Sequence, residues 1–250
     1  LMGKVSVYIR WLFILVLFFT TLSFTNKTMK KQDSNLYKIN VDYNQSLFRF
    51  ITDDIIVDYL GGLGIVSEDS LLKSISYIES TLNYHSSVKN AEVYSDISGN
   101  VVINIIQRTP IIRVKNSRFK NGFYIDKRGK IMDSSEDYSA NVLVATGNID
   151  LKDTIDLFKL AAFINEDDFW SEHIVEIKVT HNKEIELVVG FGSHIVEIGD
   201  LYDLENKLDN LFIFYRDALP TMGWDRYKNI NLKYKNQIVC TKKQVAYGTK

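Results

Sequence analysis

The chain has 250 residues, 24% of them charged, and a formal net charge of −1 at pH 7. This balance, without a long basic block, gives no electrostatic case for nucleic-acid binding. The single cysteine, Cys240, excludes an intramolecular disulfide, and we expect this small apolar side chain to be buried.

An apolar run near the N-terminus predicts a membrane-spanning helix. From Trp11 to Asn26 there are 16 residues without a charge, which cover roughly 24 Å of a hydrocarbon core about 30 Å thick. Extending the helix back to Val5, with Arg10 reaching the headgroups, completes the span. A cleaved signal peptide is the alternative, but the run is long and no Ala-x-Ala-like site follows it. We therefore expect a tail at 1–4, a transmembrane helix at 5–25 and a polar linker at 26–36.

The next part of the chain predicts a small α+β domain over residues 37–114. Apolar and polar residues alternate at 37–43, as in a half-buried strand. A short helix follows at 52–60, with Thr52 as N-cap and Gly61-Gly62 as its end. A longer helix at 67–84 precedes two strands at 88–94 and 101–107. The predicted core of this domain is Leu71, Ile75, Ile78, Val101, Ile103 and Ile105.

The second half predicts a mixed β domain with flanking helices over residues 115–243, and a flexible tail at 244–250. A hairpin at 123–132 and strands at 141–145, 174–180, 184–189, 194–198, 229–234 and 237–241 form its sheet. Asp150 is the expected N-cap of one helix, which carries Ile155, Phe158, Ala161 and Ala162. Asp200 is the expected N-cap of another, which carries one stripe of apolar residues: Leu201, Leu204, Leu208, Leu211, Phe212 and Tyr215.

No group of residues predicts catalysis, a cofactor or a metal. The four histidines, His85, His173, His181 and His194, have no i,i+4 pair and no cysteine companion, so zinc binding is not indicated. Residues 190–194 read as a hairpin turn rather than a nucleophile elbow. The acidic run 166–168 could supply half of a hydrolase carboxylate pair, but is more typical of a solvated helix end. Trp170 and Trp224 are expected to pack in the core rather than to stack on sugars.

Three local sequences, in this order of elements, resemble the bacterial cell-division family FtsQ/DivIB. They are Val101-Val-Ile-Asn-Ile-Ile-Gln-Arg-Thr-Pro-Ile-Ile-Arg113; 123–132 with 143–147; and 199–208 with 223–234 and 237–239. One departure is Asn231-Leu-Lys-Tyr234, where the family often has Asp-Leu-Arg-Tyr. The strand pattern is unchanged by it.

The resemblance implies a non-enzymatic scaffold in the cell inner membrane at the division septum. Its N-terminus would be cytoplasmic, and a POTRA domain and the β domain would lie in the periplasm. It would bind the bitopic proteins FtsB and FtsL and help to regulate the septal peptidoglycan synthase complex. The charges that flank the apolar run give no clear orientation by themselves. An anchored cell-wall enzyme or peptidoglycan-binding module remains the alternative.

The last strand, near 235–241, is the predicted binding site. No later strand follows to cover it, so its free N–H and C=O groups would accept a strand from another chain. The resemblance points to the same edge, where FtsB is expected to add a strand. A proline at Val239 would test this edge if the N–H of Val239 faces outward. Alternatively, Lys233, Lys235, Lys242 and Lys243 only protect the edge against aggregation. The predicted partner-binding residues are Tyr234, Lys235, Gln237, Ile238, Val239, Cys240 and Thr241.

Overall fold

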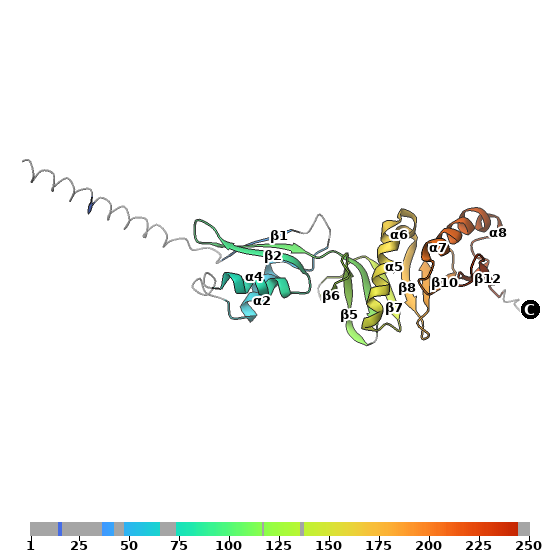
Figure 1. The fold of residues 1–250 in the computed structure, drawn as a ribbon, viewed down its shortest axis with the longest axis horizontal. Helices are drawn as coiled ribbons and strands as arrows, with labels where there is room; N and C mark the ends of the chain where they lie inside the picture. The colour runs from blue at the N-terminus through green and yellow to red at the C-terminus, as the bar shows by residue number, and fades with distance from the viewer. Residues whose placement is uncertain are drawn as a thin grey trace, which may run out of the picture. The chain divides into compact units, whose positions relative to one another are not determined.

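The structure is a computed structural model that describes residues 15–16, 37–42, 48–65, 74–116, 118–135 and 138–244 (Figure 1). The predicted segments at 1–4, 5–25 and 26–36 lie outside these residues, apart from Leu15 and Val16, as do residues 245–250. None of the helices that the structure describes is long and apolar enough to cross a membrane. The described residues divide into two compact units: 37–42 with 51–106 form the first, and 48–50 with 107–244 form the second.

In the described part of the first unit, the chain forms a three-stranded sheet and two helices. The sheet order is β1-β3-β2, and β1 runs parallel to β3. This is the predicted chain order of strand, helix, helix, strand and strand. The elements are β1 (Tyr37–Asp42), α2 (Asp53–Gly62), α4 (Ile75–Tyr84), β2 (Val88–Ser95) and β3 (Val101–Gln107).

Local sequence explains where α2 begins. The Oγ1 atom of Thr52 accepts a hydrogen bond from the N–H of Ile55 at 3.4 Å, so the predicted N-cap is confirmed. Two aspartates in the first turn add a favourable interaction with the helix dipole. Gly61 and Gly62 were expected just beyond the helix, and they are instead its last two residues.

The predicted core of the first unit is largely confirmed. Four of its members are completely or almost completely buried: Ile78, Val101, Ile103 and Ile105. Ile75 is only half-buried, because it occupies the first turn of α4, and Leu71 lies outside the described residues. Leu82, one helical turn after Ile78, is also fully buried. The apolar stripe of α4 therefore supplies the helical side of this core.

Side chains of α4 bond the outer edge of β2. Asn83 Oδ1 accepts a hydrogen bond from the N–H of Ala91 at 2.9 Å, and Asn83 Nδ2 donates one to the carbonyl oxygen of Ala91 at 3.0 Å. Glu79 Oε2 accepts from the N–H of Val93 at 3.0 Å. These backbone groups lie on an edge strand, so they would otherwise have only water as a partner.

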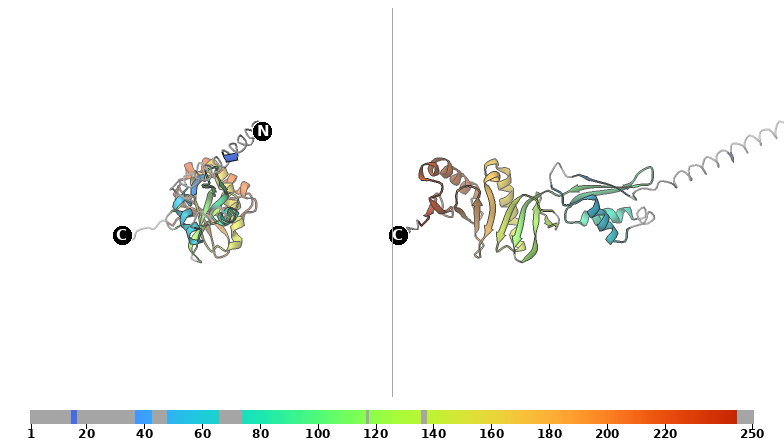
Figure 2. Two further views of the ribbon diagram at one scale, coloured as in Figure 1. Left: turned by 90° about the vertical axis from the view of Figure 1, so that its left-hand side faces the viewer. Right: turned by 180° about the vertical axis from the view of Figure 1, so that it is seen from behind.

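A nine-stranded mixed sheet forms the second unit, in the order β12-β11-β10-β9-β8-β7-β4-β5-β6. Figure 2 shows these strands from behind as well. The neighbours β4 and β7, β7 and β8, and β10 and β11 are parallel, and the other neighbours are antiparallel. The strands are β4 (Pro110–Asn116), β5 (Phe119–Asp126), β6 (Ile131–Asp133), β7 (Leu143–Gly147), β8 (Ile174–Val179), β9 (Ile185–Val189), β10 (Ile195–Gly199), β11 (Tyr227–Asn231) and β12 (Val239–Lys242).

Strand β4 corrects the boundary that the sequence predicted at 114/115. It pairs with β5 and β7 of the second sheet, so residues 110–114 do not belong to the first unit. Pro110 is the first residue of β4. Proline is tolerated at the first position of a strand, and the apolar residues Ile112 and Val114 that follow are fully buried in the second core.

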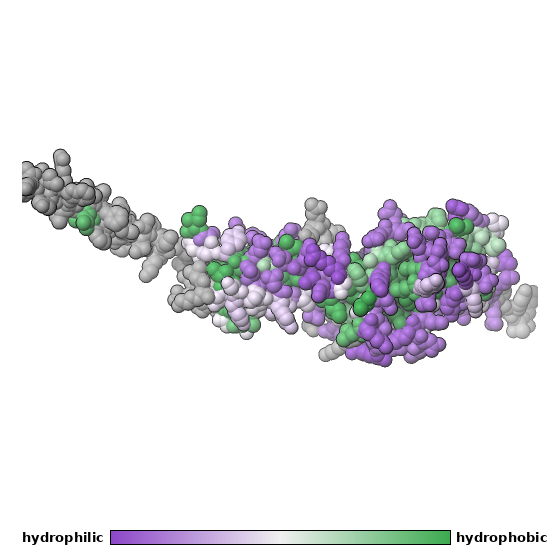
Figure 3. All heavy atoms as spheres, in the orientation of Figure 1, coloured by the Kyte–Doolittle hydropathy of each residue, from purple (hydrophilic) through white to green (hydrophobic). Residues whose placement is uncertain are grey.

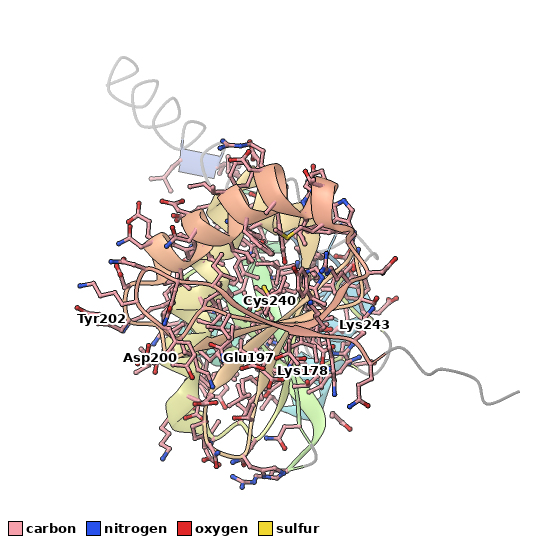
Figure 4. All side chains as sticks on the ribbon, turned by 90° about the vertical axis from the view of Figure 1, so that its right-hand side faces the viewer. Lys178, Glu197, Asp200, Tyr202, Cys240 and Lys243 are labelled. Atoms are coloured by element: carbon pink, nitrogen blue, oxygen red, sulfur yellow. The ribbon has the colours of Figure 1, made fainter. Side chains whose placement is uncertain are left out.

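The helices of the second unit cover one face of its sheet. Their apolar residues share a core with one side of the strands, including Ile177, Leu187 and Val196. Residues at the alternate positions, such as Lys178 and Glu197, lie on the opposite side of the sheet from α7 (Figure 4). The elements are a 3₁₀ turn (Leu151–Asp153), α5 (Thr154–Glu166), α6 (Asp168–His173), α7 (Leu204–Ile213), a π-helical turn (Phe214–Ala218) and α8 (Leu219–Met222).

The two predicted helix N-caps in this unit differ in outcome. Asp150 is an N-cap as predicted and forms a capping box with Asp153, but the element it caps is a 3₁₀ turn, and α5 begins only at Thr154. The predicted helix residue Ile155 is consequently 63% exposed, and Leu157 and Leu160 are buried instead. Helix α7 begins at Leu204 rather than after Asp200, because Asp203 adopts a left-handed conformation with φ of 57°. Asp200 instead forms an ion pair with Lys207 at 3.0 Å.

A candidate strand-binding edge

Strand β12 ends the nine-stranded sheet and pairs only with β11 among the described strands. The register places Val239 opposite Asn231 and Thr241 opposite Asn229. The predicted strand began earlier, but residues 234–237 form a turn. Its geometry includes a left-handed Asn236 with φ of 57°. Of the seven predicted binding residues, Val239, Cys240 and Thr241 therefore lie on the strand, Ile238 directly precedes it, and Tyr234, Lys235 and Gln237 lie in the turn.

The backbone of β12 exposes the N–H groups of Cys240 and Lys242, and not that of Val239. The N–H of Lys243 donates to the carbonyl of Arg226 at 3.1 Å, so it faces β11. Successive N–H groups of a strand point to opposite sides, so those of Thr241 and Val239 also face β11. On β11, the N–H of Leu232 donates to the backbone carbonyl of Glu197 on β10 at 2.9 Å. The backbone groups of the preceding residue, Asn231, therefore point the other way, towards Val239 on β12. A proline at Val239 would therefore disrupt the sheet itself.

Side chains of the edge alternate between the two faces of the sheet. Ile238 and Cys240 are half-buried and pack against the core beneath the helices. Cys240 was expected to be buried and is only partly so, and this partial burial raises the pKa of its thiol. Val239 is 43% exposed on the opposite face, and Thr241 is exposed beside it. An added strand would contact apolar atoms on both sides of its backbone.

Two of the four edge lysines are engaged in ion pairs elsewhere. Lys233 Nζ lies 3.1 Å from Glu184 and 3.7 Å from Glu197, and its hydrogen bond to Glu184 raises its pKa. Lys243 hydrogen-bonds to Ser193 and pairs with Asp225 at 3.9 Å. Of these four lysines, Lys235 and Lys242 are exposed and form no ion pair with the described residues. The edge is less heavily protected by charge than the sequence indicated.

Strand β11 gives β12 a well-anchored neighbour. Its Asn229 and Asn231 side chains donate to the two carboxylate oxygens of Glu197 at 2.6 and 2.7 Å. These bonds join β11 to β10 on the face that the helices leave open, where Figure 4 shows Glu197. The edge therefore rests on a cross-linked sheet, which lowers the ordering cost of adding another strand.

A buried histidine lies behind the edge. His194 is 3% exposed, and its Nε2 atom lies 2.7 Å from the hydroxyl of Tyr215. Burial lowers the pKa of His194, and Lys243 lowers it further while Asp225 opposes the shift. Burial likewise raises the pKa of Tyr215. No pattern in the sequence signalled this pair, because its members are 21 residues apart and on different elements.

The other candidate residues lie on separate elements. Glu166 is the last residue of α5 and Asp168 the first of α6, and both are exposed. His181 is exposed in the turn between β8 and β9. Within the described ranges, no cluster of three or more His, Cys, Asp or Glu side chains could hold a metal ion. Trp170 is buried as predicted, whereas Trp224 is 37% exposed, with its ring next to those of Phe191 and Tyr215.

The chain was compared with known protein families and with curated proteins. The family described as FtsQ/DivIB, C-terminal related, matches residues 109–241. This range runs from the start of β4 to β12, so it contains nearly all of the second unit and the candidate edge. None of the curated proteins compared with the chain matches it.

Proposed function

The chain belongs to the FtsQ/DivIB C-terminal related family, and we propose that it is a membrane-anchored divisome scaffold that binds FtsB- and FtsL-like proteins. The family has a role in cell division, and its members are generally non-enzymatic. In this proposal the scaffold contributes no chemistry. It acts by holding partners of the septal peptidoglycan synthase complex at the division site.

The open edge of β12 is the observation that carries the proposal. An incoming strand of an FtsB-like partner would hydrogen-bond to the outward backbone groups of Cys240 and Lys242. Val239 would contact the added strand on one face, and Ile238 on the other. Main-chain bonds would supply much of the affinity, and these side chains would select the partner sequence.

The remaining architecture of the proposal follows the family resemblance. The first unit would be a POTRA domain, and residues 5–25 would form the single transmembrane helix in the inner membrane at the septum. Residues from about 26 onward would lie in the periplasm. Protease added to spheroplasts is expected to digest the C-terminal part. Full protection of that part, in cells shown to admit the protease, would contradict this topology.

Proline substitutions on β12 test the binding edge. Cys240→Pro or Lys242→Pro removes one outward donor, whose hydrogen bond contributes about 0.5–1.5 kcal/mol. Binding of the FtsB-like partner to the full chain should therefore be about 2- to 13-fold weaker, and pull-down recovery should fall accordingly. The loss is larger if the proline ring also blocks the approach of the added strand. Lys242→Ala separates the loss of the side chain from that of the backbone donor.

A matched control lies at the other end of the same sheet. The N–H of Asp126 donates to the carbonyl of Lys130 at 2.9 Å, and alternation then directs the N–H of Ile131 outward from β6. Ile131→Pro is the equivalent edge substitution and should leave partner recovery unchanged. If folded Cys240→Pro and Lys242→Pro variants both retain the partner as well as Ile131→Pro does, β12 is not the binding edge.

A further inference from the structure

We propose that an aromatic strip beside α6 and α7 binds a basic amphipathic helix of another polypeptide. The aromatic strip consists of Phe212 on α7, Phe169 on α6, Phe191 between β9 and β10, and Trp224 after α8. Ring centroids are 5.0 Å apart for Phe212 and Phe169, 6.4 Å for Phe169 and Phe191, and 5.2 Å for Phe191 and Trp224. This surface does not include β12, so the inference goes beyond the proposed strand addition.

The strip is exposed at its ends and rigid underneath. Phe212 and Trp224 are each 37% exposed, while Phe169 and Phe191 are half-buried. Trp170 and Tyr215 are buried and contact Phe169 and Phe191 from below. Apolar residues come to the surface around α6 and α7 in Figure 3, within a largely hydrophilic surface. Rigid, partly exposed aromatic rings cost little conformational entropy on binding and are frequent anchors of protein interfaces.

The charges that flank the strip are acidic. Asp168 and Glu172 accompany Phe169 on α6, and Asp209 lies one turn before Phe212, all of them exposed. Asp225, which follows Trp224, already pairs with Lys243 at 3.9 Å, so its charge is not available in the same way. The two basic residues of α7 and its π-helical turn are already engaged. Lys207 pairs with Asp200 at 3.0 Å, and Arg216 pairs with Asp217 at 2.6 Å. An apolar strip between carboxylates complements a helix with apolar residues on one face and Lys or Arg on its flanks.

The dimensions of the strip fit a short helix. Four rings in consecutive contact can be covered by about three helical turns, which rise about 16 Å. Apolar side chains at positions i, i+3 or i+4, and i+7 of the partner would face the rings. Basic side chains on either flank would then reach Asp209 and Glu172.

Photo-crosslinking in the host cells tests the proposal with the full chain. Benzoylphenylalanine at Phe212 or Trp224 should form adducts with a partner segment that is basic and has apolar residues at helical spacing. Tyr202 is the matched control, since it is 82% exposed just before α7 and outside the strip. Adduct yield there should be at least fivefold lower. Equal yield at Tyr202, no adduct at either test position, or an acidic or extended partner segment would each overturn the proposal.

A charge reversal tests the acidic flank separately. Asp209→Lys should lower the adduct yield from benzoylphenylalanine at Trp224 at least fivefold, since the substitution leaves the rings intact. Asp156→Lys on α5 is the control, because Asp156 is equally a helical, exposed acid that lies outside the strip. Unchanged yield with Asp209→Lys would show that the partner segment is not held by positive charge.

Discussion

Replacing His194 by Gln is expected to remove part of the pH dependence of the stability of the second unit. The imidazole is buried, and its Nδ1 atom has no hydrogen-bond partner among the described residues. Its pKa is lowered in the folded protein, first by burial and then by Lys243, while Asp225 acts in the opposite direction. Between the unfolded and folded pKa values, the unfolded chain binds a proton that the folded chain does not. Stability is therefore fully present above pH 6.5 and decreases as the pH falls.

The size of this effect follows from the ordinary histidine pKa. The unfolded pKa of histidine is about 6.5. Between pH 7.5 and pH 5.5, the free energy of unfolding should therefore decrease by at most about 1.4 kcal/mol because of His194. Urea unfolding can be followed by the fluorescence of Trp170 and Trp224, whose rings contact Tyr215. In His194→Gln, the decrease in the free energy of unfolding from pH 7.5 to pH 5.5 should be smaller than in the wild type by up to about 1.4 kcal/mol. In the control His181→Gln, this decrease should equal that of the wild type. An equal pH slope in the wild type and in His194→Gln would refute the reasoning.

Three further predictions follow from packing and from the candidate residues. Ile78→Ala removes a completely buried side chain from α4 and should cost about 2–5 kcal/mol; a melting temperature within about 1 °C of wild type would contradict the assigned core. Gly147→Ala should lower the yield of folded protein, measured by circular dichroism and solubility. Gly147 has φ of 100°, and an added Cβ would lie 2.1 Å from the carbonyl oxygen of Val179. Single alanine substitutions at the exposed candidates of the enzyme hypothesis, Glu166, Asp168 and His181, should leave cell division intact in a complementation assay. Loss of division by a normally folded variant would revive that hypothesis.

Strands and hairpins were predictable because their signals are local. Alternation at 88–94 reports a buried and an exposed face directly, and the apolar residues at 101–107 report a central strand; both strands are confirmed. Helix starts were less predictable. The start of α7 is displaced by Asp203, whose backbone is left-handed, and no common sequence motif predicts a left-handed residue at this position. The same limit applies to the turn at Asn236, which shortens β12. The aromatic strip and the pair of His194 with Tyr215 depend on contacts between distant elements, which no periodicity reports.

The edge strands β2 and β12 differ in how their backbone groups are bonded. At the edge of β2, helix α4 supplies Asn83 and Glu79 as partners for the N–H groups of Ala91 and Val93, so an incoming strand would have to displace formed hydrogen bonds. At β12, the described residues provide no such side-chain partners for Cys240 and Lys242. Adding a strand there forms main-chain bonds without first breaking protein bonds. This difference in cost favours β12 over β2 as the edge for strand addition, independently of the family to which the chain belongs.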